Sequence, residues 1–166
     1  VEEVTLVTQN PQEQFVASTV EEEVAFALQS LGIPQAEMKE RVHRALKHWN
    51  LFELRSASPG ELSGGERKRV LLAATEAIDA PFWILDEPFD DLDEEGRVHL
   101  ARVIKESDKT ILLFSSRYLQ HFDGLFDQSL LLDQKRIIKQ ANEDALTAFT
   151  TLCGDDELTV LEQQTP

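Results

Sequence analysis

The sequence predicts an α/β fold with a partial parallel sheet, and three observations support this prediction. Two short apolar runs, PFWILD at 81–86 and TILLFS at 110–115, have the length and composition of buried strands. Residues 93–106 lie between them and carry apolar side chains at helical spacing. Because strand, helix and strand follow in that order, they form a βαβ unit whose two strands are parallel.

The segment before this unit is mostly helical in pattern. VEEVTLVTQ at 1–9 predicts a strand, which Asn10 and Pro11 end. Thr19 and Glu22 then have the spacing of a capping box and predict the start of a helix. Three helices, each with an apolar face, are expected here: 18–31, 35–52 and 63–77.

The segment after the βαβ unit shows weaker patterns. QSLLLDQKRIIKQ at 128–140 predicts a hairpin of two short strands. A closing helix is expected over 141–152, and 157–166 have the composition of a tail or linker.

Composition narrows the classes of protein to consider. The chain has 166 residues, enough for one domain, and its 31 acidic and 16 basic side chains give a net charge of −15. This charge disfavours nucleic acid as a partner, because no basic cluster offsets repulsion from phosphates. The single Cys153 excludes a disulfide within the chain and fits a reducing compartment. The first residue is Val1, so we expect the chain to be part of a longer protein.

The stretch LSGGE at 62–66 supports two interpretations. Ser63 and Glu66 have capping-box spacing, in which case the two glycines only loosen the turn. The same helix start would also attract an anion, because its exposed N–H groups carry partial positive charge. Gly64 and Gly65 would then let a phosphate approach the backbone, and Ser63 would add a hydroxyl donor. The residues alone leave both interpretations open.

The stretch FWILDEPFDDLD at 82–93 places Asp86 and Glu87 directly after an apolar strand. Ligands of open α/β sheets bind at the carboxyl ends of the strands. Asp86 is therefore a candidate to orient Mg²⁺, and Glu87 a candidate to polarise an attacking water. The alternative is a solvated acidic turn, and Asp93 is expected to favour the start of the next helix by its charge.

No P-loop is found in the chain. Gly60 and Gly65 have the glycine spacing of that motif, G-x-x-x-x-G. However, Glu66 and Arg67 follow where the motif requires Lys and then Ser or Thr.

The two motifs, in this order and joined by a helix, resemble those of the ATP-binding subunits of ABC (ATP-binding cassette) transporters. Residues 62–66 match the signature motif of that family, and 83–87 match its Walker B strand. Gln9 matches the Q-loop, and 92–93 match the D-loop. The resemblance covers about 1–139. The stretch QNPQEQFVASTVEEEVAFAL is similar to the ATPases of energy-coupling-factor importers, which take up vitamins, cobalt or nickel.

This resemblance implies a P-loop NTPase core of the ABC ATPase type with a helical signature subdomain. It implies a partial nucleotide-binding domain at 1–156, followed by the tail. Within that domain it implies three parts: a helical subdomain at about 15–80, a part with Walker B, D-loop and switch loop at 81–139, and a C-terminal helix at 141–152.

In this family two ATPase domains hold ATP between them head to tail. The resemblance therefore implies that the signature residues face ATP and Mg²⁺ bound by a second ABC ATPase domain, in a homo- or heterodimer. The residues implied in this nucleotide contact are Ser63, Gly64, Gly65, Glu66 and Asp93.

The resemblance also implies roles for residues that face ATP bound by this chain itself. Asp86 would orient Mg²⁺ together with Gln9, and Glu87 would activate the hydrolytic water. Gln9 would also report the nucleotide state to a transmembrane transporter subunit. Ser116 stands where the family has a switch histidine, and a histidine occurs only later, at His121, which we expect to be a surface or packing residue.

The implied function is ATP hydrolysis that drives an importer of vitamins or metal ions at the cytoplasmic face of the membrane. The alternative, raised by Ser116, is a degenerate module that lends its signature motif to a partner ATPase without turnover. A soluble ABC ATPase acting on DNA or ribosomes is disfavoured, because the chain has neither a long coiled coil nor a basic linker.

The missing P-loop has two expected consequences. Residues 1–166 alone should bind ATP weakly or not at all. We therefore expect hydrolysis only from the longer protein to which they belong. The Walker A strand is central in the sheets of the family, so we also expect an unpaired sheet edge beside the Walker B strand. Such an edge recruits other strands and would favour self-association.

Overall fold

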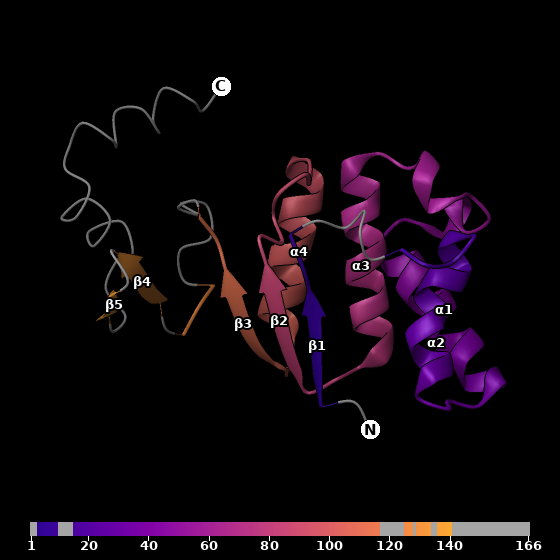
Figure 1. Cartoon of the computed structure of the whole chain (residues 1–166), viewed down its shortest axis with the longest axis horizontal. Helices are drawn as coiled ribbons and strands as arrows, with labels where there is room; N and C mark the ends of the chain where they lie inside the picture. The colour runs from indigo at the N-terminus through magenta and orange to yellow at the C-terminus, as the bar shows by residue number, and fades with distance from the viewer. Residues whose placement is uncertain (1–2, 10–14, 117–124, 128, 134–135, 141–166) are drawn as a thin grey trace. The chain divides into compact units, whose positions relative to one another are not determined.

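The computed structural model describes residues 3–9, 15–116, 125–127, 129–133 and 136–140. The chain forms two compact units, 1–115 and 116–166, each described here by itself (Figure 1). In the second unit, β4 (Ser129–Asp133) and β5 (Arg136–Gln140) pair as antiparallel strands, so the predicted hairpin is confirmed. The predicted closing helix and tail lie outside the described residues, and the domain limits given above remain predictions.

A parallel sheet of three strands forms the centre of the first unit. Its strands are β1 (Val4–Val7), β2 (Phe82–Asp86) and β3 (Thr110–Phe114), in the spatial order β1-β2-β3. Helix α4 (Glu94–Glu106) connects β2 to β3, which confirms the predicted βαβ unit. Each of these short strands ends near the same sheet edge, where loops can bring polar residues together.

The prediction of an unpaired sheet edge beside the strand that carries Asp86 is wrong. Strand β2 is the middle strand: Val4 pairs with Phe82 on one side, and Phe82 pairs with Thr110 on the other. Both edges of β2 are therefore satisfied by hydrogen bonds within the chain, and the edge strands of the described sheet are β1 and β3.

Three helices form a group beside β1 (Figure 1). They are α1 (Val20–Ser30), α2 (Gln35–His48) and α3 (Gly64–Ile78), with short 3₁₀ turns at Phe52–Leu54 and Pro59–Glu61. Helix α1 begins with the predicted capping box, because Thr19 and Glu22 exchange side-chain to backbone hydrogen bonds of 3.3 and 3.2 Å. The apolar faces of the three helices meet in one core: Val24, Leu28, Val42, Leu46, Trp49, Val70 and Leu72 are all buried.

Helix α4 covers one face of the sheet (Figure 1). Val7, Trp83 and Leu85 are buried in that sheet, and Leu100 of α4 is fully buried as well. Side chains of a strand alternate between the two faces, so every second residue belongs to the opposite face.

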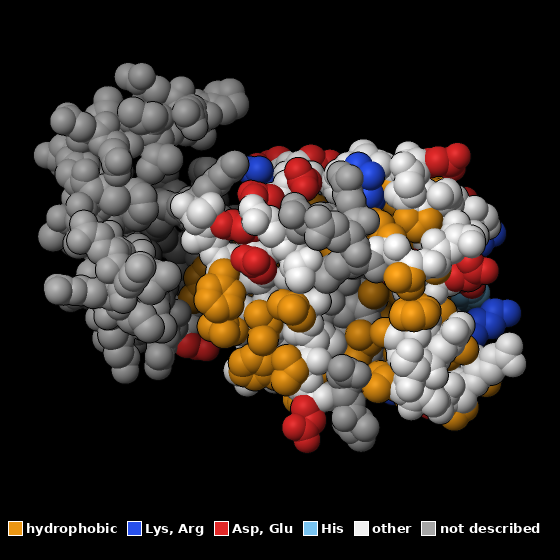
Figure 2. All heavy atoms as spheres, in the orientation of Figure 1, with side chains coloured by type: hydrophobic (Ala, Val, Ile, Leu, Met, Phe, Trp, Pro, Cys, Tyr) orange, Lys and Arg blue, Asp and Glu red, His pale blue; other side chains and the backbone are white. Residues whose placement is uncertain are grey.

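That opposite face of the sheet is apolar and open. Val4, Leu6, Leu112 and Phe114 are exposed by 44%, 55%, 41% and 51%. The register places Leu6, Ile84 and Leu112 in one row across the three strands. Figure 2 shows this face as an orange patch over the sheet. The sequence predicted β2 as buried on both faces, but the described residues place helices against only one of them.

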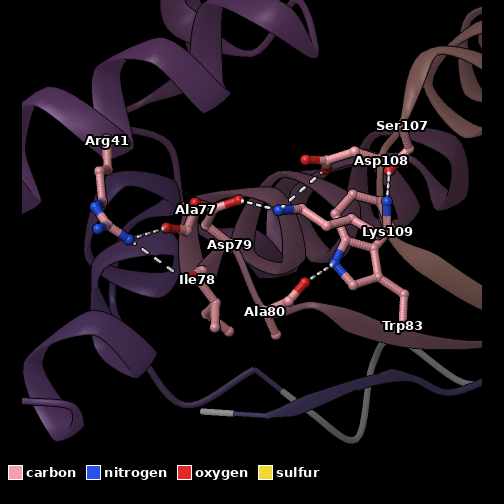
Figure 3. A network of polar contacts seen from close by, with 9 residues as sticks. All are labelled: Arg41, Ala77, Ile78, Asp79, Ala80, Trp83, Ser107, Asp108 and Lys109. Carbon is pink, nitrogen blue, oxygen red and sulfur yellow. Dashed lines mark hydrogen bonds and ion pairs between the residues drawn. The ribbon is translucent and has the colours of Figure 1, made fainter. Parts of the chain in front are cut away.

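The C-terminal end of α3 lies at the sheet edge where the strands begin (Figure 3). Asp79 ends this helix in a left-handed conformation. From α2, one guanidinium nitrogen of Arg41 donates to the carbonyl oxygens of Ala77 and Ile78 at 3.4 Å. From the segment before β3, Lys109 forms an ion pair of 2.8 Å with Asp79. The last carbonyls and the C-cap of α3 are thus held from two sides.

Two histidines of the helices, His48 and His99, pack beside Trp49. His48 and the indole N–H of Trp49 both contact the Glu76 carboxylate, at 2.8 and 2.7 Å. The ring of His99 stands edge-on to the Trp49 ring, with centroids 4.8 Å apart. None of the described helices is long and apolar enough to cross a membrane.

Candidate functional site

The acidic end of β2 lies at the carboxyl edge of the sheet, where the sequence predicted a site. Asp86 is the last residue of the strand and is half-buried. Glu87 follows it and is only 9% exposed. Its backbone φ is +46°, a left-handed value that is uncommon for any residue with a side chain as long as that of glutamate.

Several hydrogen bonds hold Glu87 in this conformation. Its N–H donates to the carbonyl oxygen of Phe114 at 3.0 Å, and its own carbonyl accepts from the Asp90 N–H at 3.2 Å. The Ser115 hydroxyl donates to the carboxylate of Glu87 at 3.2 Å. A backbone in a sparsely populated region persists only where its surroundings determine it, and such residues cluster at functional sites.

The glycine-led start of α3 is a capping box. The Ser63 hydroxyl accepts from the Glu66 N–H at 3.3 Å and donates to the Glu66 carboxylate at 2.7 Å. That carboxylate also accepts from the Ser63 N–H at 2.8 Å. The side-chain hydrogen bond from Ser63, followed by the backbone one, lowers the pKa of Glu66 below its usual value. The capping box of the first interpretation is confirmed, and the phosphate contact of the second stays a proposal.

The two predicted motifs meet within the chain, because α3 begins against the loop that follows β2. A Cβ atom on Gly65 would stand 2.8 Å from the Asp91 carbonyl oxygen, a distance that real Cβ atoms essentially never show. A Cβ atom on Gly64 would stand 3.4 Å from the side chain of the same aspartate. Close packing against this loop is therefore a structural reason for glycine at both positions, in addition to the access for phosphate inferred from the sequence.

Asp93 begins helix α4. Its carboxylate accepts from the Gly96 N–H at 2.8 Å, as an N-cap does. This agrees with the expectation that the charge of Asp93 favours a helix N-terminus. The nucleotide contact implied for Asp93 remains a proposal.

Gln9 lies just beyond β1 at the same edge of the sheet. Its carbonyl oxygen accepts from the ammonium of Lys68 at 3.4 Å, and the carbonyl of Glu87 accepts from that ammonium at 3.1 Å. Lys68 belongs to α3 and is fully buried. Sequence reasoning missed Lys68, because GERKR has the charged composition of an ordinary solvated helix face.

Ser116 is exposed just after β3. The hydrogen bond from a serine hydroxyl to the Glu87 carboxylate comes from the preceding residue, Ser115. Arg117 and His121 lie outside the described residues.

The donors at this edge suit a metal that arrives with phosphate. Among the described residues, no group of three or more His, Cys, Asp or Glu side chains could hold a metal ion. Mg²⁺ is commonly held by one or two carboxylates together with substrate phosphates, and such a site does not require a cage of protein ligands. Asp86, half-buried at the strand end, fits this arrangement.

Comparison with known proteins identifies the family. Residues 2–90 match the family model described as ABC transporter. The chain belongs to this family.

Individual relatives and a solved structure agree with the family match. The energy-coupling factor transporter ATP-binding protein EcfA1 of Enterococcus faecalis is 43% identical over 113 residues, which cover 66% of this chain and 40% of that protein. EcfA1 of Lactococcus lactis is 37% identical over 145 residues, 86% of this chain and 52% of the relative. The structure of cbiO1 from Clostridium perfringens, part of the ABC transporter complex cbiONQ, superposes with a TM-score of 0.72 at 24% identity, covering 99% of this chain and 64% of that one. That structure supports the ABC ATPase fold, and the chain spans about half the length of these EcfA1 relatives.

Proposed function

We propose that this ABC family chain is part of an ATP-hydrolysing transporter subunit and supplies its signature helix and its acidic strand end. The observation that carries the proposal is the placement of Glu87: it is buried, left-handed and fixed at the end of the middle strand, directly after Asp86. A fixed carboxylate beside a strand end can accept the proton of an attacking water. The relatives named as transporter ATP-binding proteins support the same activity.

The proposed roles follow the two motifs. Asp86, with Gln9, would orient Mg²⁺ that arrives with ATP, and Glu87 would act as the base for water. The bound metal ion would neutralise charge on the phosphates. On the other motif, Ser63 and the N–H groups of Gly64 and Gly65 would approach the phosphates of ATP held by a second ATPase domain, with Glu66 and Asp93 nearby. For this the Ser63 hydroxyl would exchange its hydrogen bond to Glu66 for one to phosphate.

The proposed partners are a second ABC ATPase domain and a transmembrane subunit, which place the protein at the cytoplasmic face of the membrane. The proposed cargo is a vitamin or a metal ion, since the relatives carry the name energy-coupling factor transporter. Purification of the full-length protein with its membrane subunits, followed by uptake assays in vesicles, tests both statements. Hydrolysis without any such partner or cargo would leave the activity standing and refute the transport role.

Hydrolysis by the full-length protein that contains this chain tests the assignment of Glu87. We expect Glu87→Gln to lower kcat for MgATP by about 100-fold or more, because the amide cannot accept a proton. Glu95→Gln is a matched control, since Glu95 is exposed on α4. A wild-type protein without hydrolysis would contradict the proposal in favour of a module that only lends its signature motif. A Glu87→Gln variant as active as the control would refute the role of Glu87 as the base.

A further inference from the structure

Lys68 is a charged side chain in an unusual environment. It lies on α3, 0% exposed, one turn after the helix begins at Gly64. Lysine is almost never fully buried unless its ammonium is paired, because transfer of a charge out of water is costly. A buried lysine at this position therefore needs partners that offset the cost.

Its partners are the ends of two strands. The ammonium donates to the carbonyl oxygen of Glu87 at 3.1 Å and to that of Gln9 at 3.4 Å. These carbonyls follow β2 and β1, which are neighbours in the sheet. Because both acceptors belong to the main chain, Lys68 fixes the backbone that carries the proposed functional side chains.

The charge of Lys68 is also matched by its surroundings. Four carboxylates at the end of β2 and in the loop after it act on the ammonium electrostatically: those of Asp91, Asp90, Asp86 and Glu87. Burial lowers the pKa of Lys68, and these carboxylates oppose that effect by raising it. A cation beneath a loop with so many negative charges also reduces their mutual repulsion.

We infer that Lys68 is a positioning residue for Glu87, which makes the placement of this carboxylate depend on helix α3. The inference rests on the proposed function, because positioning matters only if Glu87 acts on water. The Glu87 carbonyl accepts from Lys68 of α3 and from Asp90 of its own loop, while its N–H is held by Phe114 of β3. Loss of Lys68 removes the contact to the helix that begins with the signature motif.

The inference also links the two motifs. Helix α3 carries Ser63 at its first turn and Lys68 one turn later. A displacement of the first turn, for example by phosphate approaching Ser63, would move the ammonium and with it the Glu87 and Gln9 carbonyls. The same lysine thus connects the signature motif to the ends of both β1 and β2.

Steady-state hydrolysis by the full-length protein tests this inference. Lys68→Met has a similar length but neither charge nor donors. We expect it to lower kcat by about 10- to 100-fold, because small displacements of a reacting group have effects of that size, while KM for ATP changes by less than about threefold. Lys68→Arg keeps the charge and the donors, so we expect its kcat to be at least about tenfold higher than that of Lys68→Met. Lys105→Gln, exposed on α4, is the control for loss of a positive charge and should leave kcat unchanged.

The outcomes separate this inference from the proposed function. If the wild type hydrolyses ATP and Glu87→Gln is inactive, but Lys68→Met keeps wild-type kcat, the inference is wrong and the function stands. If the wild type does not hydrolyse ATP, the proposed function itself is wrong. Lys68→Gln serves as a second neutral variant should Lys68→Met not fold. Failure of both to fold, shown by circular dichroism and thermal unfolding, would assign Lys68 a structural role and overturn the inference. If Lys68→Met raises KM for ATP by about 10- to 100-fold and leaves kcat unchanged, the inference is overturned as well.

Discussion

Helix α3 begins at the acidic edge of the sheet and ends at the opposite edge, and the two ends are held by different kinds of contact. At the first end, the helix start lies against the Asp91 carbonyl, and Lys68 is buried beneath the acidic loop. Glu87 and Asp91 there have positive φ values of 46° and 65°. At the other end, Arg41 and Lys109 hold the helix terminus through long hydrogen bonds and a partly solvated ion pair (Figure 3).

This difference separates two requirements of the fold. The C-terminal end carries contacts that any helix terminus can use. The backbone of Asp79 there is left-handed, a conformation that aspartate tolerates well. The first end combines close packing with a buried charge and a left-handed glutamate, and each of the last two costs stability by itself. Such a concentration of costly features at one edge is typical of a functional site. Substitutions should therefore affect the two ends to different extents.

The largest effect on stability is expected at Gly65. A Cβ atom there would stand 2.8 Å from the Asp91 carbonyl oxygen, and backbone atoms cannot easily move apart. We expect Gly65→Ala to lower the free energy of unfolding by about 1–2 kcal/mol, although alanine otherwise favours a helix. Urea or thermal unfolding measures the change. Gly60→Ala is the control, because its Cβ would stand 3.7 Å from the Ser58 hydroxyl, an ordinary contact. Equal stability of the two variants would refute the close approach of loop and helix.

A smaller effect is expected from Arg41 at the opposite end of the helix. Arg41→Met removes donors to the Ala77 and Ile78 carbonyls while keeping most of the apolar stem. Because these hydrogen bonds are long, we expect a loss of about 0.5–1 kcal/mol in the free energy of unfolding. Arg44→Met, on an exposed part of α2, should change it very little. A loss larger than that of Gly65→Ala would reverse the proposed ranking of the two ends.

The smallest effects concern pH, and the two ends should respond at opposite extremes. Hydrogen bonds from Ser63 lower the pKa of Glu66, so its contribution is present above the unfolded pKa and is lost as pH falls through the folded one. The hydrogen bond to Asp79 raises the pKa of Lys109, so its contribution is present below the unfolded pKa and is lost as pH rises through the folded one. Each contribution should be below about 1 kcal/mol, because these groups remain partly solvated.

Unfolding of two variants across pH checks this prediction. The stability difference between wild type and Glu66→Gln should shrink as pH falls below about 4, and that for Lys109→Met should shrink as pH rises above about 10. Differences that do not change with pH would show that the charges contribute nothing. A Lys109 contribution that persists unchanged as pH rises well above about 10 would contradict the assigned direction.

Local spacing in the sequence was enough to predict much of the fold. The capping boxes at Thr19 and Ser63 depend on residues three apart, so they can be recognised without tertiary information. The βαβ unit follows from two apolar runs and the helix between them, and its parallel pairing is confirmed. The acidic strand end was located for the same reason, since Asp86 and Glu87 directly follow a short apolar run.

Other features depend on contacts between segments far apart in the sequence. The burial of Lys68 arises because β1 and β2 lie side by side, so that carbonyls 78 residues apart meet one ammonium. The placement of β2 between β1 and β3 overturned the expected open edge, because pairing order cannot be deduced from a strand's own composition. Likewise the Ser115 contact to Glu87 depends on how the ends of β2 and β3 align.

The left-handed backbone of Glu87 means that a saturation library at this codon would report two different rankings. A readout of folded protein should favour glycine, asparagine and aspartate, which adopt this conformation most easily, over valine and isoleucine. A readout of turnover should favour glutamate alone, because only its side chain combines the required length with a carboxylate that can accept a proton. Disagreement between the two rankings at one codon would separate what this residue does for the architecture from what it does for chemistry.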